Sequence, residues 1–289
     1  MSRIPKQDCK DFKYANYSYK GKILRTSIRT RYRLSDLRTK FNIFTDILFH
    51  ITPITDNCSR FYLLRSSKRR SNDDKIFYHN LFSLKFVFNK DGGYEPISLP
   101  KFEPVVFKYI ISQHGKVFID VGANQGGYSI HSFRNFEKII AVEPSLKAQE
   151  ILKKNIDINS IKNITIIPKA VTTLTGKVKL FHADDLVNYS IVNQSDVYEE
   201  VPTISLNDLL LPFDSVDLVK IDVEGAELDV INSGLKYLNR VKSLVIEVRH
   251  RYEGEIVSLM KKLGFRCYVL EWRKDLDEKN LLFLKENFE

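Results

Sequence analysis

The feature that most constrains the fold is an alternation, from about residue 93 onward, between short β-branched runs and segments with helical periodicity. This alternation is the signature of an α/β domain around a mostly parallel sheet. The expected strands are 116–122, 138–143, 163–171, 177–181, 216–225, 241–248, 265–270 and 281–286. The expected helices cover 126–136, a segment capped by Ser145, a segment that stops near 232–234, and one that ends near Gly264.

A glycine-rich loop follows the first expected strand, in the sequence VFIDVGANQGGYS at 117–129. Asp120 lies next to the strand end, and Gly122, Gly126 and Gly127 let the backbone turn tightly and approach a ligand without a Cβ atom in the way. Glu143 ends the second strand, 23 residues after Asp120. Because ligands of open α/β sheets bind at the carboxyl ends of the strands, an acid there can accept hydrogen bonds from both hydroxyls of a ribose. These residues predict a nucleoside ligand.

The same loop restricts which nucleoside compound fits. No Gly-Lys-Ser/Thr follows the glycines, which excludes a P-loop, and Asn124 stands where a dinucleotide fingerprint needs its middle glycine. The charge of Asp120 disfavours a diphosphate and favours a cation. S-adenosyl-L-methionine meets these conditions best, since it has a ribose, an ammonium group and a sulfonium but no phosphate. The alternative is an α/β domain whose glycines are incidental.

Three motifs, FIDVGANQGGYS, AVEPS and VKIDVEGAELDVINSG, resemble in their order and spacing the FkbM family of S-adenosylmethionine-dependent methyltransferases. The resemblance covers residues 93–289. It implies a Rossmann-like class I methyltransferase fold, with a seven-stranded sheet, a final antiparallel strand and helices on both faces. It also implies methyl transfer to an oxygen, commonly a hydroxyl of a sugar, polyketide or similar metabolite.

The resemblance also assigns site residues. By match to the motifs, Asp120, Gly122 and Asn124 border the methionine end of the cofactor, and Glu143 holds the ribose. The third strand is followed by Pro168, Lys169 and Ala170, without a counterpart of the adenine-side acid. The predicted cofactor-binding set is Asp120, Gly122, Asn124, Gly126, Glu143 and Asp222.

Methyl transfer to a hydroxyl needs alignment of the two reactants and a proton acceptor. The candidate catalytic residues are Asp222 at the end of the IDVEG strand, Glu247 at the end of the next strand, and His250 just beyond it. Histidine has the most suitable unperturbed pKa for a base, whereas the pKa of a carboxylate would have to be raised by burial. A further cluster, His182 with Asp184 and Asp185, could reach substrate or form an exposed turn. We expect no obligatory metal.

Each candidate also has a purely structural interpretation. Asp222 could cap the following helix, Glu224 could complement the helix dipole, and Glu247 could pair with Arg249 or Arg251. His250 could be a solvated loop residue. The sequence does not decide between these alternatives.

The net charge of +9 is concentrated at the N-terminus, where residues 1–70 contain 17 Lys and Arg but 5 Asp and Glu. We therefore expect residues 1–92 to be a basic extension with helical character and 93–289 to be the methyltransferase domain. Such a segment could meet nucleic acid, anionic lipid or a phosphorylated substrate, or could be a solvated arm. The acceptor pocket is expected to form from this segment and from residues 182–200.

The start of the chain has no apolar signal region and no apolar run is long enough to span a bilayer, so we expect no transmembrane segment. Three widely spaced cysteines fit free thiols in a cytoplasmic protein, with attachment at a membrane surface as a variant. The predicted function is O-methyl transfer to a glycan or small metabolite. RNA methylation through the basic segment and a non-catalytic scaffold are the alternatives.

Overall fold

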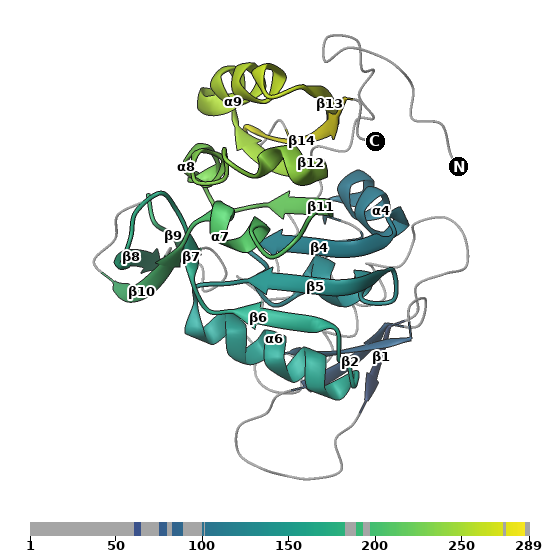
Figure 1. The fold of residues 1–289 in the computed structure, drawn as a ribbon. Coiled ribbons are helices and arrows are strands. Elements are labelled where there is room, and N and C mark those ends of the chain that lie inside the picture. Colours follow the sequence, from purple (N-terminus) through teal and green to yellow (C-terminus); the bar gives the residue numbers. More distant parts are fainter. Residues whose placement is uncertain are drawn as a thin grey trace.

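The computed structural model describes residues 61–64, 75–79, 83–88, 100, 102–182, 189–192, 197–273 and 276–286. Its centre is a seven-stranded sheet in the order β13-β14-β12-β11-β4-β5-β6 (Figure 1). The parallel strands are β4 (Gly115–Val121), β5 (Phe136–Val142), β6 (Ile164–Ile167), β11 (Val216–Ile221) and β12 (Val241–Arg249). β14 (Glu278–Lys285) runs antiparallel to both β12 and β13 (Phe265–Arg273). The predicted α/β fold, a Rossmann-like seven-stranded sheet with a final antiparallel strand, is confirmed.

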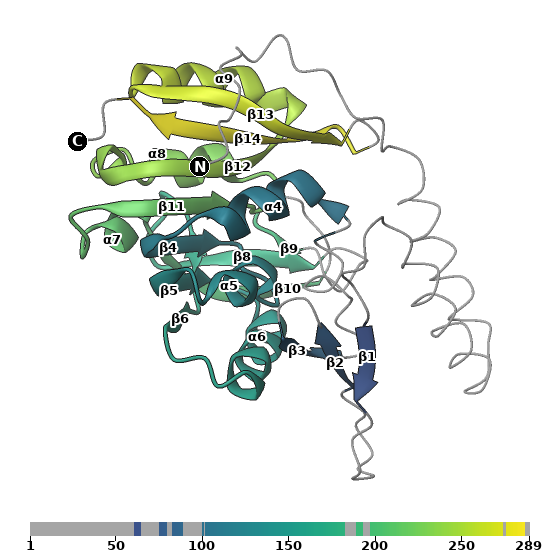
Figure 2. The ribbon, with the colours of Figure 1, turned by 90° about the vertical axis from the view of Figure 1, so that its right-hand side faces the viewer.

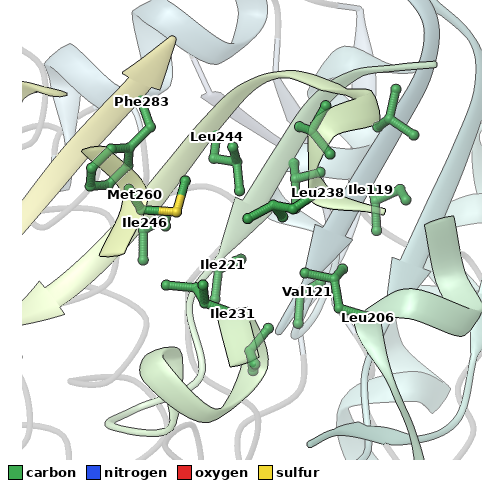
Figure 3. Packing of buried hydrophobic residues seen from close by; sticks show 14 of the residues in the cluster. Ile119, Val121, Leu206, Ile221, Ile231, Leu238, Leu244, Ile246, Met260 and Phe283 are labelled. Carbon is green, nitrogen blue, oxygen red and sulfur yellow. The ribbon is translucent and has the colours of Figure 1, made fainter. Parts of the chain in front are cut away.

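Helices cover both faces of this sheet. One face carries α4 (Pro104–Ser112), α5 (Gly127–Ser132) and α6 (Leu146–Ile158). The other carries α7 (Leu206–Leu210), α8 (Glu227–Asn232) and α9 (His250–Lys262), with a short 3₁₀ helix, η2 (Leu238–Arg240), before β12. Figure 3 shows the core of this second face, where Val121 and Ile221 of the sheet lie near Ile231 of α8 and Ile246 near Met260 of α9.

The helix boundaries follow local sequence signals. Ser145 caps α6 as predicted, since its Oγ accepts from the Ala148 amide at 3.5 Å. α8 ends at Asn232, within the predicted stop at 232–234. The helix expected over 126–136 is shorter, because Phe136 already begins β5.

Pro168 divides the single strand expected over 163–171. Proline cannot donate a ladder hydrogen bond, so β6 ends before it and the chain leaves the main sheet. The residues that follow form a second sheet in the order β7-β10-β8-β9. Its strands are β7 (Ala170–Val171), β8 (Lys177–His182), β9 (Tyr189–Ser190) and β10 (Tyr198–Ile204). The sequence interpretation contained β8 but missed β9 and β10.

The predicted N-terminal extension contributes strands to the structure. β1 (Phe61–Leu64), β2 (Lys75–His79) and β3 (Leu84–Phe88) form a three-stranded antiparallel sheet next to α6 (Figures 1 and 2). Leu84 and Phe86 are buried in a cluster with Leu152 of α6. Asn155 of α6 accepts from the Val87 amide at 2.7 Å and donates to the Gln125 carbonyl at 3.0 Å. β3 is therefore joined to both α6 and the glycine-rich loop, although it precedes the expected boundary at residue 92.

Most of the basic segment lies outside the described residues. The division into 1–92 and 93–289 and the role of the segment stay predictions. None of the helices in the described part of the chain has the length and apolar character that a bilayer crossing requires.

Candidate active site

A row of polar side chains begins at the carboxyl ends of the central strands, on the face that α4 and α5 cover. Four apolar residues, Phe118, Leu218, Val245 and Leu282, lie on that face in the middle of the sheet. The same face of each strand carries a polar residue two positions closer to the edge where β4 and β11 end. These residues are Asp120, Lys220, Glu247 and Asn280, and all four are buried. Asp120 is directly opposite Lys220, and Glu247 directly opposite Asn280. The side chains on this face thus change from apolar to polar within two residues on four adjacent strands, and this polar row is the candidate active site.

The glycine-rich loop is held against the ends of β5 and β11. The amides of Gly122 and Ala123 donate to the Val142 carbonyl at 2.9 and 3.0 Å. Gly122 has φ +81°, and a Cβ atom there would lie 1.8 Å from the Asp222 carbonyl oxygen. Only glycine allows the two strand ends to approach this closely. Gly126, the predicted cofactor residue at the start of α5, instead accommodates Leu152, which a Cβ would meet at 2.4 Å.

Two buried carboxylates flank this loop. Ser129 Oγ donates to Asp120 Oδ2 at 2.6 Å. The Asn124 amide donates to Glu143 Oε2 and the Ser145 amide to Glu143 Oε1, both at 2.8 Å. Burial raises the pKa of Asp120 to about 6 and the pKa of Glu143 to about 7. Each Glu143 oxygen keeps a further lone pair for a ligand, since a carboxylate has about four acceptor sites.

Leu146, at the start of α6 and three residues beyond Glu143, is 61% exposed. Ile151, Leu152 and Ile156 of the same helix are buried. Leu146 is therefore an apolar side chain left open to solvent at the start of α6.

Asp222 follows β11 and shares its side of the strand with Lys220. Lys220 Nζ lies 2.9 Å from Asp222 Oδ2 and 5.3 Å from the centre of the Tyr128 ring. Burial alone would lower the pKa of Lys220, but the carboxylates of Asp222, Glu103 and Glu247 raise it above its usual range. Lys220 is therefore a buried cation, whereas the Asp222 side chain is 28% exposed. A signal was present in the sequence, because Lys220 stands between the apolar residues Val219 and Ile221 near the end of this strand.

Three carboxylates, those of Asp222, Glu224 and Glu247, offer ligand atoms within 4.8 Å of one another, which is a possible metal-binding arrangement. Each already has a cationic partner. Lys220 pairs with Asp222, Arg249 with Glu224 at 2.9 Å, and Arg273 with Glu247 at 2.5 Å. We derive no metal-dependent step from this cluster, and the expectation that no metal is required stays a prediction.

Arg273 of β13 connects this cluster to the start of α4. Its guanidinium lies 3.1 Å from Glu103 and 2.7 Å from Glu278, in addition to Glu247. Tyr128 donates a short hydrogen bond to Glu103. Burial raises the pKa of Glu247 well above its usual range, and burial raises the pKa of Glu224 to about 7. The sequence offered Arg249 or Arg251 as partners for Glu247, but the structure gives it Arg273.

The remaining predicted residues are placed as follows. His250 begins α9, its side chain is 70% exposed, and its Nδ1 lies 3.4 Å from Glu253 one turn along the same helix. Asp222 does not cap α8, whose N-cap is Ala226. The side chain of His182, together with Asp184 and Asp185, lies outside the described residues.

The second sheet contacts this site at Ser190. Ser190 of β9 is buried and donates from Oγ to the Glu224 carbonyl at 3.0 Å. Figure 1 shows β8, β9 and β10 beside the edge toward which the arrowheads of β4, β5 and β11 point. Part of the predicted acceptor region 182–200 therefore adjoins the acidic cluster.

The fold is a Rossmann-like α/β sheet with acids at the ends of neighbouring central strands. Residues 120–267, which are half of the chain, match the methyltransferase FkbM domain. The chain belongs to the FkbM methyltransferase family, and its cofactor is accordingly S-adenosyl-L-methionine.

The chain is also similar to individual proteins. It is 24% identical to methyltransferase sdnD of Sordaria araneosa over 187 residues, which are 51% of this chain and 72% of that protein. The structure of methyltransferase FkbM from Methylobacillus flagellatus KT is 16% identical, with a TM-score of 0.40, over 59% of this chain and 43% of that one. The precorrin-6y C5,15-methyltransferase from Geobacter metallireducens GS-15 has a TM-score of 0.41 at 14% identity, over 63% of this chain and 88% of that one. The family assignment rests on the domain match.

Proposed function

We propose that this methyltransferase transfers the methyl group to oxygen, on a hydroxyl of a sugar, glycan or small metabolite. The observation that carries the proposal is the combination of two buried acids at neighbouring strand ends with a partly exposed carboxylate cluster next to them. A hydroxyl is a weak nucleophile unless a base accepts its proton, and in this cluster burial raises the pKa of Glu224 to about 7.

In this proposal Asp120, Gly122, Asn124, Gly126 and Glu143 form the cofactor site. The donor set fits an adenosyl cation, because Asp120 and Glu143 supply buried negative charge and the loop carries no phosphate-binding lysine. Glu143 would accept from the ribose hydroxyls, and Asp120 would face the methionine ammonium. Leu146 would offer an apolar surface to the adenine, for which no acidic partner was found in the sequence. When bound, the cofactor supplies an electrophilic methyl group.

We assign proton acceptance to Asp222 rather than to Glu247 or His250. The Asp222 side chain is partly exposed and is paired with Lys220, whereas the Glu247 side chain is buried in its ion pair with Arg273. His250 is a surface residue paired with Glu253. The placement of Asp222 in the cofactor-binding set stays a prediction.

Replacing Asp222 with asparagine is expected to lower kcat by about 10²- to 10⁴-fold, the usual contribution of a general base. Binding of S-adenosylhomocysteine should stay nearly unchanged, because the amide still accepts from Lys220. Single-turnover transfer of labelled methyl from the cofactor measures the first quantity, and calorimetry measures the second. Asp214→Asn is the control, since Asp214 is an exposed acid at the opposite edge of the sheet. Unchanged turnover in Asp222→Asn would remove Asp222 as the base.

Cofactor affinity is expected to fall as the pH is lowered from 8 to 6. Protonation of Glu143 near pH 7 and of Asp120 near pH 6 removes the charges that the ligand needs. Linkage then predicts an increase of about tenfold in the Kd for S-adenosylhomocysteine. Because both folded-state pKa values are raised, these groups stabilise the free protein at low pH and lose that contribution as pH rises through about 6 and about 7. The ligand-induced rise in Tm should therefore be larger at pH 8 than at pH 6, and Glu143→Gln should flatten most of this dependence.

The acceptor class can be tested by offering labelled cofactor to two pools, a polysaccharide and lipid-glycan extract and total RNA. We expect label in the glycan pool. Label confined to RNA would replace this proposal with RNA methylation, and the absence of bound S-adenosylhomocysteine in a folded sample would favour the non-catalytic scaffold.

A further inference from the structure

Three strands of the second sheet place a row of side chains on one face. Phe181 of β8 is directly opposite Tyr198 of β10 on one side and Ser190 of β9 on the other. Directly opposite residues of antiparallel strands project from the same face of a sheet. The ring centres of Phe181 and Tyr198 lie 5.9 Å apart, which agrees with this placement.

One end of the row is fixed at the active site and the other is open. Ser190 is buried where it bonds the Glu224 carbonyl, Phe181 is half-buried, and Tyr198 is 48% exposed. Lys179 lies on the same face, with Nζ 4.1 Å from the centre of the Tyr198 ring. Exposure of aromatic surface therefore increases with distance from the acidic cluster.

The opposite face of the sheet has a different role. Leu180, Val201 and Ala170 form a small buried cluster there, with Val178 and Ile191 packed against it. The sheet thus uses that face for its own stability, and Phe181 and Tyr198 are not needed for its core. Both aromatic rings are instead partly open to solvent, on the face whose Ser190 contacts the Glu224 carbonyl.

We propose that Phe181 and Tyr198 are the acceptor-binding platform and that they stack on the ring of a neutral sugar. This inference rests on the proposed function and specifies its substrate class. The C–H face of a pyranose presents apolar surface to an aromatic ring, while its hydroxyls can donate to carboxylates such as Asp222 and Glu224 at the end of the row. The same carboxylates repel a phosphate next to the loop, so a neutral sugar fits better than a nucleotide or a phosphorylated acceptor.

The test measures binding of methyl pyranosides by saturation-transfer NMR on the full chain saturated with S-adenosylhomocysteine. The probes are the methyl glycosides of glucose, galactose and mannose, with adenosine monophosphate as the nucleotide probe. We expect saturation at the ring C–H protons of at least one glycoside. Its Kd should rise about tenfold in Tyr198→Ala and in Phe181→Ala, equivalent to roughly 1.4 kcal/mol, and recover in Tyr198→Phe.

Leu211→Ala is the matched control. Leu211 is a 54% exposed apolar residue between α7 and β11, at the edge of the seven-stranded sheet where β11 begins. Its glycoside affinity should equal that of the wild type, and all variants should bind S-adenosylhomocysteine equally. The platform is overturned if no glycoside binds, if both alanine variants bind the glycosides as tightly as the wild type, or if only adenosine monophosphate binding depends on Tyr198 and Phe181. Failure of the wild type to bind S-adenosylhomocysteine would instead contradict the proposed function.

Discussion

Glu143→Ala is expected to raise the Kd for S-adenosylhomocysteine by about 10²- to 10⁴-fold. Two ribose hydroxyls would each lose a hydrogen bond to a charged acceptor, worth about 1.5–3 kcal/mol per bond. The substitution also removes the acceptor for the Asn124 and Ser145 amides, so the loop loses one of the hydrogen bonds that hold it. Isothermal titration calorimetry at pH 8, where the Glu143 carboxyl is ionised, gives the two affinities.

Glu150→Ala is the control for this experiment, because Glu150 is an exposed acid on α6. Its affinity should match that of the wild type. Glu143→Gln should lie between the wild type and Glu143→Ala, since the amide keeps an acceptor but not the charge. An affinity of Glu143→Ala close to that of the wild type would show that the ribose binds elsewhere.

Lys220→Met is expected to lower the free energy of unfolding by about 3–5 kcal/mol, the usual result of removing one partner of a buried ion pair. Lys220 is fully buried, and its ammonium faces Asp222 with Glu103 and Glu247 nearby. Removing the ammonium leaves three acidic groups with less compensating charge. Urea denaturation at pH 8 measures the loss.

Lys242→Met provides the comparison, because Lys242 pairs with Asp217 at 2.7 Å but is 45% exposed. Its loss should be at most about 1 kcal/mol, as for other exposed ion pairs. The double variant Lys220→Met/Asp222→Asn should recover part of the stability, so the two substitutions should be non-additive. Additive losses would mean that Lys220 stabilises the fold independently of Asp222.

The parts of this protein that could be predicted from the sequence are those set by local patterns. The run VKIDVEG and the glycine-rich loop each combine a buried strand with a turn, and Ser145 precedes its helix as a cap. Each of these signals is contained in a few consecutive residues. Because each marks the end of a parallel strand, together they also place Asp120, Glu143 and Asp222 at one edge of the sheet.

The parts that could not be predicted depend on contacts between distant residues. Arg273 reaches Glu103 across 170 positions, and no local pattern relates β13 to the start of α4. β10 was missed because Glu199, Glu200 and Pro202 interrupt the apolar alternation of a short strand. The aromatic row depends on the register between β8, β9 and β10, which only the structure supplies.

The most direct test of the account is a crystal structure of this chain with S-adenosylhomocysteine. We predict that both ribose hydroxyls lie within hydrogen-bonding distance of the Glu143 carboxylate, with the ammonium group on the side of Asp120 and the sulfur directed toward Asp222. A nucleoside bound away from the ends of β4 and β5, or one with Glu143 turned from the ribose, would contradict it.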